Sequence, residues 1–208
     1  FYNMLEISKT NQIKHLIFAS TSSVYGENNN FPLKESYSTS KPLSFYAATK
    51  KSNEIMAYAY SNIYNLPSTA LRFFTVYGPY GRPDMFMFKL LESMYFKKKL
   101  YVYNNADHFR DFTYIDDVVN AYLKVISSIR VMGDFEVRCY EVGTGRAQSL
   151  KDFVITARRI IGSKSKLLFG ALPYRENEIM LSRANNSSIK NIQRNLHHIK
   201  AILLGNII

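Results

Sequence analysis

The sequence is poor in cysteine and has no long apolar run, and each absence excludes a class of protein. Cys139 is the only cysteine among 208 residues, so the chain can form neither an internal disulfide nor a zinc site with several thiolates. No stretch approaches the roughly 20 apolar residues that span a bilayer. Residues 1–12 contain neither a basic leader nor an apolar block with a cleavage site. We therefore expect a cytoplasmic protein with no membrane partner and no bound metal.

Acidic residues are also scarce, and the formal net charge is +11. Such an excess favours an anionic partner: a nucleic acid, a membrane surface or a phosphorylated small molecule. The basic residues are spread along the chain, and the longest run, Lys97–Lys99, is typical of a solvated helix end. Because the sequence has no zinc-finger, KH or RNP signature, we do not expect a nucleic-acid partner.

Short apolar runs alternate with segments of helical periodicity. Ser44–Tyr64 follows Pro42, contains no glycine or proline and carries apolar residues at helical spacing, which predicts a long helix. The other predicted elements are strands over Lys14–Ser20, Ser68–Phe74, Phe112–Ile115 and Arg138–Val142, and helices over Asp116–Ser127 and Ser149–Ile161.

This alternation predicts an α/β fold: a partial Rossmann-like, doubly wound parallel sheet with a small C-terminal substrate-binding lobe. We assign residues 1–78 and 106–142 to the Rossmann-like domain, and residues 79–105 and 143–208 to the lobe. In such a fold the active site lies at the carboxyl ends of the strands.

Tyr46 and Lys50 stand four residues apart on the predicted long helix, so both side chains project from one face. A fixed lysine charge favours the ionised form of a nearby phenol. Tyr46 could then act as a general base on a hydroxyl group while a hydride leaves for a cofactor. A tyrosine and a lysine four residues apart are common by chance, so the neighbouring sequence decides whether the pair indicates catalysis.

Those surroundings resemble a known family. The strings SSVYG, YAATKKSNEIMAYAYS, LRFFTVYGPYGRPDM and RDFTYIDDVV are similar, almost letter for letter, to the extended short-chain dehydrogenase/reductase family of sugar-nucleotide enzymes, and most closely to UDP-glucuronate 4-epimerases. The resemblance implies NAD as cofactor and a nucleotide sugar as substrate. It also implies C4 epimerisation through a transient 4-keto sugar, here of UDP-glucuronate to UDP-galacturonate.

The same resemblance implies roles for individual residues. Tyr46 would be the catalytic base, Lys50 would bind the nicotinamide ribose and promote ionisation of the tyrosine, and Thr21 would help to relay the proton. Phe73 would lie beside the nicotinamide. Tyr46, Lys50 and Phe73 are thus the predicted cofactor-binding residues.

The loops after the strands bear on the substrate. Related dehydratases have an Asp-Glu pair after the threonine, and uronate decarboxylases have a Glu at the second position, where this chain has Ser22 and Ser23. A 4-keto uronate loses carbon dioxide unless its carboxylate is held in an unproductive orientation. Ser22, Ser23 and Thr75 offer hydroxyl donors for that carboxylate, and Arg82 offers a fork-shaped cation. The resemblance assigns these four residues to uronate binding.

Three more residues match substrate contacts of the family. Arg110 matches an arginine that binds the diphosphate. Arg175 matches a second phosphate ligand, and Glu178 matches a carboxylate that binds the ribose hydroxyls. For Arg175 a surface ion pair with Glu178 is the alternative.

The chain has no glycine-rich phosphate loop, although the family carries one after its first strand. Gly143-Thr144-Gly145 lacks both the third glycine and the later acidic residue of a dinucleotide fingerprint, so we assign it a structural role. We therefore expect an N-terminally incomplete chain that binds NAD weakly by itself. Residues after Ile189 match the family only loosely, and His197-His198 has no accompanying metal ligands.

Several alternatives stay open. One is another epimerase, dehydratase or reductase of the same family. A second is a catalytically silent fragment that acts as a dimerisation or binding module, because Ser44–Tyr64 resembles the helix through which family members form homodimers. A third, favoured only by charge, is a nucleic-acid binder.

Overall fold

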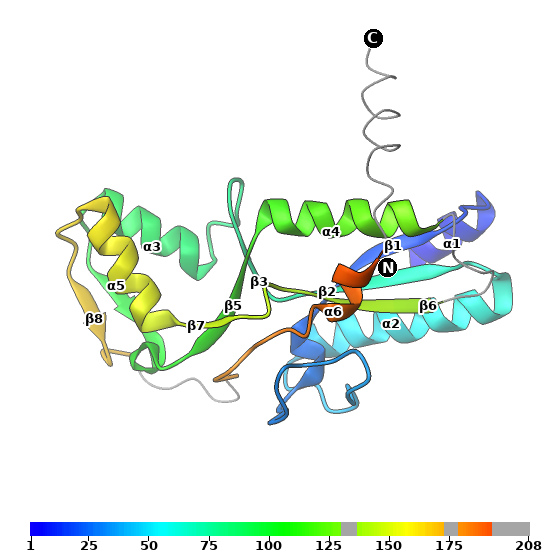
Figure 1. The fold of residues 1–208 in the computed structure, drawn as a ribbon, viewed down its shortest axis with the longest axis horizontal. Helices are drawn as coiled ribbons and strands as arrows, with labels where there is room; N and C mark the ends of the chain where they lie inside the picture. The colour runs from blue at the N-terminus through cyan, green and yellow to red at the C-terminus, as the bar shows by residue number, and fades with distance from the viewer. Residues whose placement is uncertain (130–136, 173–178, 193–208) are drawn as a thin grey trace, which may run out of the picture.

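A computed structural model of the chain describes residues 1–129, 137–172 and 179–192. Figure 1 shows an elongated molecule, with a helix-flanked sheet at one end and a smaller lobe at the other. No helix within these ranges is long and apolar enough to cross a lipid bilayer. The elements in chain order are α1 (Tyr2–Thr10), β1 (Leu16–Thr21), the 3-10 helix η1 (Ser22–Tyr25), α2 (Phe45–Tyr64), β2 (Ser68–Phe73), β3 (Thr75–Tyr77), α3 (Phe86–Tyr95), β4 (Leu100–Val102), the 3-10 helix η2 (Tyr103–Ala106), β5 (Phe109–Tyr114), α4 (Ile115–Ser128), β6 (Val137–Val142), β7 (Ala147–Ser149), α5 (Leu150–Ile161), β8 (Leu167–Phe169) and α6 (Ser187–Asn191).

Strands β1, β2 and β6 form a parallel sheet in that order. Leu71 at its centre is aligned with Ala19 on one side and Tyr140 on the other. Helix α2 covers one face of the sheet and α4 covers the other (Figure 1). Each face has its own apolar cluster, one around Leu5 and Ala57 and one around Val118 and Val125. This arrangement confirms the predicted α/β fold with a parallel sheet.

Helix α2 places the predicted catalytic pair. Its N-cap is Ser44, whose Oγ accepts the backbone N–H of Ala47 at 3.1 Å. Its C-cap is Asn65, which adopts the left-handed conformation with φ 53°, two residues before Pro67. The prediction of a helix over Ser44–Tyr64 is confirmed, and its first turn lies beside the end of β1.

The remaining predicted elements are also present, with shifted ends. The largest shift is in β5, which begins at Phe109 rather than at Phe112. Its second and third residues, Arg110 and Asp111, are charged, and they interrupt the apolar run from which the strand was predicted. They pair instead with the antiparallel strand β7, which was not predicted.

The smaller lobe is built from two distant parts of the chain. Strands β4 and β8 pair in parallel, and helices α3 and α5 pack with them. Its core contains Leu90, Met94, Val102 and Val154, all at most 2% exposed. Strands β3, β5 and β7 form the sheet that connects the lobe to the rest of the molecule.

The predicted domain boundary needs a correction at its C-terminal side. Residues 143–208 were all assigned to the lobe, but Ile189 of α6 packs with Leu71 and Val142 in the main sheet's core. Ala184 likewise pairs with Leu33, outside the lobe. After β8 the chain passes back to the main sheet, where burial of these apolar side chains stabilises its position.

Candidate active site

A pocket of about 640 Å³ opens where β1 and β2 end and the loop before α3 begins. This volume is typical of a small-molecule site. Seven predicted site residues line it: Thr21, Ser22, Ser23, Tyr46, Thr75, Arg82 and Arg110. The strands end beside one another, as expected for a parallel sheet, and most of the candidate residues therefore lie in one cavity.

The turn after β1 contributes three hydroxyl groups. Thr21 Oγ1 accepts the backbone N–H of Ser23 at 3.2 Å and lies 3.2 Å from the Ser23 hydroxyl. Ser22 and Ser23 open the 3-10 helix η1, so its first residues face the pocket. The turn presents a compact set of donors and acceptors to a polar ligand.

Tyr46 lies at the mouth of this pocket, and Lys50 lies behind it. Tyr46 is 53% exposed and lines the cavity. Lys50, one helical turn later, donates from Nζ to the carbonyl oxygen of Ala19 in β1 at 3.2 Å. The lysine charge is thereby held at the end of β1.

Arg82 has a partner that the sequence analysis did not consider. Its Nε donates to Asp84 Oδ1 at 3.0 Å, and its Nη2 donates to Oδ2 at 2.5 Å. The hydrogen bond from Arg82 lowers the pKa of Asp84, so this carboxyl is ionised at neutral pH. A substrate carboxylate would have to share the guanidinium with Asp84. The spacing Arg-Pro-Asp was a visible signal for this pair.

Arg110 joins two cavities. It lines the pocket described above and a second pocket of about 370 Å³, which extends into the lobe along Tyr101, Val102 and Tyr103. Its Nη1 donates to the carbonyl oxygen of Met180 at 3.3 Å. A cation between two cavities is well placed to bind an anionic group that links two parts of a ligand.

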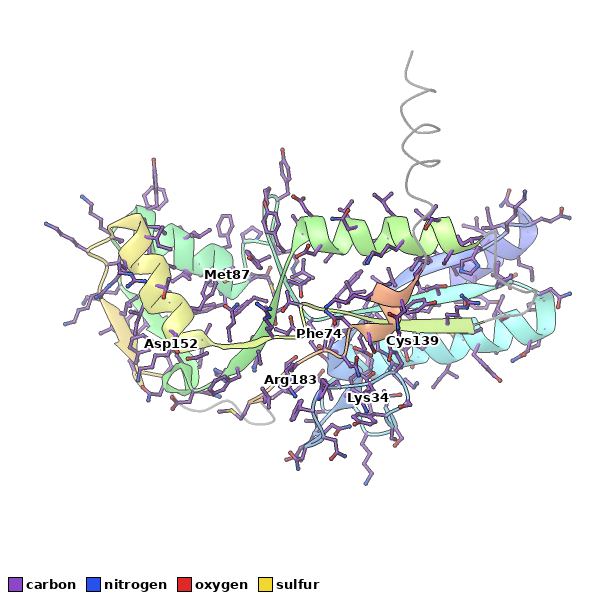
Figure 2. The ribbon with its side chains drawn as sticks, in the orientation of Figure 1. Lys34, Phe74, Met87, Cys139, Asp152 and Arg183 are labelled. Atoms are coloured by element: carbon purple, nitrogen blue, oxygen red, sulfur yellow. The ribbon has the colours of Figure 1, made fainter. Side chains whose placement is uncertain are left out.

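Phe73, like Lys50, is a predicted cofactor contact that does not line the pocket. Its ring packs against Tyr122 of α4, with ring centroids 5.9 Å apart, and it does not line the pocket. The next residue, Phe74, is buried and does line it, at the junction between sheet and lobe (Figure 2). Neighbouring residues of an extended chain point to opposite sides, and the sequence could not say which of the two faces the site.

Two predicted residues, Arg175 and Glu178, lie outside the described part of the chain, as does His197-His198. In the described part, no group of His, Cys, Asp and Glu side chains could hold a metal ion. Sequence reasoning did not assign the other residues that line the pocket, although three of them lie within a quoted family string: Leu43, Ser44, Phe74, Val76, Met85, Ile179 and Ser182.

Backbone N–H groups of the turn Gly143-Thr144-Gly145 bind a carboxylate of the protein itself and are not available to a phosphate. Asp111 of β5 accepts the backbone N–H of Thr144 at 2.7 Å and that of Gly145 at 2.9 Å. It also accepts the N–H of Ala184 at 3.1 Å. These contacts support the structural role assigned to the turn.

A buried ionic cluster lies directly behind the Ser22-Ser23 turn. Arg72 donates twice to Glu54, at 2.9 Å each, and donates from Nη1 to the hydroxyl of Tyr25 in η1 at 2.6 Å. The same Tyr25 hydroxyl donates to the carboxylate of Glu141. The cluster ties η1 to strands β2 and β6 and to α2.

Burial and pairing act in opposite directions on the two carboxyls of this cluster. Burial raises the pKa of Glu141 to about 8, against the hydrogen bond from Tyr25 and the charge of Arg72. Burial also acts to raise the pKa of Glu54, but the hydrogen bonds and charge of Arg72 outweigh it and hold that pKa below its ordinary value. Glu54 is therefore the ionised partner of Arg72.

The donor set fits one part of a nicotinamide cofactor. Lys50 and Tyr46, in the first turns of α2, are suited to a ribose diol and to a group beside the nicotinamide. In the ranges that the structure describes, no glycine-rich turn joins a strand to a helix N-terminus, where a pyrophosphate would bind. The described residues thus fit the nicotinamide riboside portion only.

A profile of the NAD dependent epimerase/dehydratase family matches residues 1–143. The chain belongs to this family. A probable UDP-glucuronate 4-epimerase of Rhizobium meliloti is 36% identical over an alignment of 193 residues, and the match covers 86% of this chain and 56% of the relative. The chain spans about half the length of the curated relatives it matches.

Solved structures of the family agree with the fold. The UDP-glucuronic acid 4-epimerase of Bacillus cereus, in complex with UDP-glucuronic acid and NAD, superposes with a TM-score of 0.82 at 30% identity and covers 91% of this chain and 58% of its own. A UDP-N-acetylglucosamine 4-epimerase of Methanobrevibacter ruminantium gives 0.82 at 27% identity, covering 93% and 61%. The family and the partial Rossmann-like fold expected from the sequence are confirmed.

Proposed function

We propose that this chain carries the catalytic and sugar-binding half of an NAD-dependent nucleotide-sugar 4-epimerase, with UDP-glucuronate as the substrate. The observation that carries the proposal is the convergence of Tyr46, Thr21 and Arg82 on one pocket together with the Ser22-Ser23 turn. The names of the similar proteins support the same reaction class.

The mechanism assigns each step to a side chain of this pocket. When bound, NAD would accept the hydride from C4 of the sugar and, after the 4-keto sugar has rotated in the pocket, would return it to the opposite face of C4. Tyr46 removes the proton from the sugar 4-hydroxyl and returns it at the end, and Thr21 orients that hydroxyl. Lys50, fixed on the Ala19 carbonyl, holds positive charge near the phenol and would bind the nicotinamide ribose.

Two adjoining cavities support the substrate assignment. A sugar in the pocket beside Tyr46 would direct its carboxylate to Ser22, Ser23 and Thr75, with Arg82 as the cationic partner. The diphosphate would then meet Arg110, and the nucleoside would enter the lobe pocket. Arg175 and Glu178 stay predictions for the phosphate and ribose contacts.

The proposal is tested by following UDP-glucuronate in the presence of NAD by NMR, where UDP-galacturonate appears as separate anomeric signals. The assay uses the chain itself and a chimera that joins to its N-terminus the preceding segment of the Rhizobium meliloti relative. We expect turnover in the chimera. If the chimera folds and binds NAD but leaves UDP-glucuronate unchanged, the proposed reaction is wrong.

Replacing Arg82 by alanine tests the uronate assignment. Loss of a charged hydrogen bond of about 1.5–3 kcal/mol lowers kcat/KM for UDP-glucuronate by about 10- to 150-fold. Turnover of UDP-glucose, if present, should change little. The matched control is Arg146→Ala, because Arg146 is an exposed arginine outside the pocket. Equal loss for both sugars would contradict a role for Arg82 in carboxylate binding.

A second candidate function is epimerisation of a neutral UDP-hexose. It is favoured by the pairing of Arg82 with Asp84, which already supplies the guanidinium with a carboxylate. A wild-type protein that converts UDP-glucose or UDP-N-acetylglucosamine faster than UDP-glucuronate would support this candidate over the first.

We also propose a homodimer through α2 and its neighbour α1. The two helices pack on each other, yet Ile55 and Tyr58 of α2 are 58% and 61% exposed, and Met4 and Ile7 of α1 are 54% and 55% exposed. Burial of such a surface favours association. We expect Ile55→Glu/Tyr58→Glu to convert a dimer to a monomer in light scattering, whereas Val119→Glu on α4 leaves it unchanged. A wild-type monomer would refute the proposal.

A further inference from the structure

The distal tip of the lobe exposes large apolar side chains. Helices α3 and α5 end there side by side: the hydroxyl of Ser163 donates to the carbonyl oxygen of Met94 at 2.9 Å. The last residue of α3 and the residue after it, Tyr95 and Phe96, are 79% and 59% exposed. Ile160, in the last turn of α5, is 78% exposed. Figure 1 shows this lobe at the end of the molecule opposite α1 and α2.

The same tip is strongly basic. Residues 95–99 and 158–166 contain seven exposed basic residues and no acidic one: Lys97, Lys98, Lys99, Arg158, Arg159, Lys164 and Lys166. The last two lie beside the first three, because Leu100 pairs with Leu167 and the backbone N–H of Leu100 donates to the carbonyl of Lys166. Lys98 also pairs with Glu92 at 3.1 Å. Basic residues from both arms of the lobe thus lie on the same tip as the exposed apolar side chains.

The apolar and basic groups are arranged together. The rings of Tyr95 and Phe96 meet edge to face, with centroids 5.0 Å apart, and the Lys98 ammonium lies 5.1 Å from the Phe96 ring. Tyrosine has an apolar ring and a polar hydroxyl, which suits it to the boundary between lipid headgroups and acyl chains. Aromatic and aliphatic side chains beside lysines are typical of protein surfaces that bind at this boundary. The cations could bind the phosphates of a nucleic acid, but contact with Ile160 would add little to the affinity for a nucleic acid. An exposed aliphatic side chain favours a lipid bilayer as the partner.

We infer that this tip, formed by residues 95–99 and 158–166, docks on the surface of an anionic lipid bilayer. Tyr95, Phe96 and Ile160 enter the interface, and the cations of the tip bind the headgroups. The inference is independent of the proposed enzyme activity and departs from the sequence expectation that no membrane is a partner. A contact of this kind needs no helix that spans the membrane.

The test is co-sedimentation of the chain with vesicles of phosphatidylcholine alone and of equal parts phosphatidylcholine and phosphatidylglycerol. We expect binding to the anionic vesicles that weakens with added salt. Because one lysine near such a surface contributes about fivefold, Lys97→Gln/Lys98→Gln/Lys99→Gln should bind at least about tenfold more weakly. The matched control replaces three exposed lysines of the sheet half, Lys14, Lys34 and Lys41, with glutamine.

A second pair of variants tests the apolar part. Tyr95→Ser/Phe96→Ser should lower vesicle binding by at least about tenfold, whereas Val119→Ser/Ile126→Ser, at two exposed apolar positions of α4, should not. Circular dichroism confirms that each variant is folded. Absence of binding, equal binding to both kinds of vesicle, equal effects of tip and control variants, or tighter binding to a random oligonucleotide than to vesicles would each overturn the inference.

Discussion

Replacing Tyr46 with phenylalanine is expected to lower kcat for the epimerisation by about 10²- to 10⁴-fold, the usual contribution of a positioned general acid or base. The ring remains and only the hydroxyl that exchanges the proton is lost. Binding of the UDP-sugar should weaken by no more than about tenfold, because one neutral hydrogen bond contributes about 0.5–1.5 kcal/mol. Turnover is measured by NMR in the chimera, and binding by calorimetry.

Tyr80→Phe is the matched control, because Tyr80 is a fully exposed tyrosine in the loop that carries Arg82 and does not line the pocket. It removes the same atom and should leave kcat unchanged. A Tyr46→Phe protein that retained wild-type turnover would show that another group moves the proton, and it would remove the main support for the proposed mechanism.

The local elements of this chain could be predicted because they depend on near neighbours. Helix α2 has a serine N-cap, an uninterrupted apolar stripe and a proline shortly after its end, and all three signals lie within Ser44–Pro67. The ends of β1 and β2 could be located in the same way. Since parallel strands bring their carboxyl ends together, Thr21, Tyr46 and Thr75 could be placed in one site.

Features that depend on register and on distant contacts could not be predicted. Which of Phe73 and Phe74 lines the pocket depends on which side of the chain faces it. Helix α6 joins the main core because Ile189 packs in the same apolar cluster as Leu71. The exposed tip of the lobe appears only when α3 and α5 end together, although each contributing segment was visible in the sequence.

The buried cluster behind the active site leads to the largest expected change in stability. Replacing Arg72 with methionine removes the bidentate partner of Glu54 and a donor to Tyr25. It also removes the cation beside the buried Glu141 and leaves the buried Glu54 with only Lys51 as a cationic partner. Removing one partner of a buried ion pair costs about 3–5 kcal/mol. We expect the urea midpoint of the chain to fall accordingly, with an unchanged dependence on urea concentration.

Lys51→Met provides the matched comparison, because Lys51 pairs with the same Glu54 at 3.2 Å from a more exposed position. Its loss should cost less than about 1 kcal/mol. Adding Glu54→Gln to Arg72→Met should recover part of the lost stability, since the stranded charge is then removed. If Arg72→Met cost no more than Lys51→Met, the cluster would not stabilise the fold. Because Tyr25 belongs to η1, a real loss would also loosen the Ser22-Ser23 turn and weaken binding of the sugar.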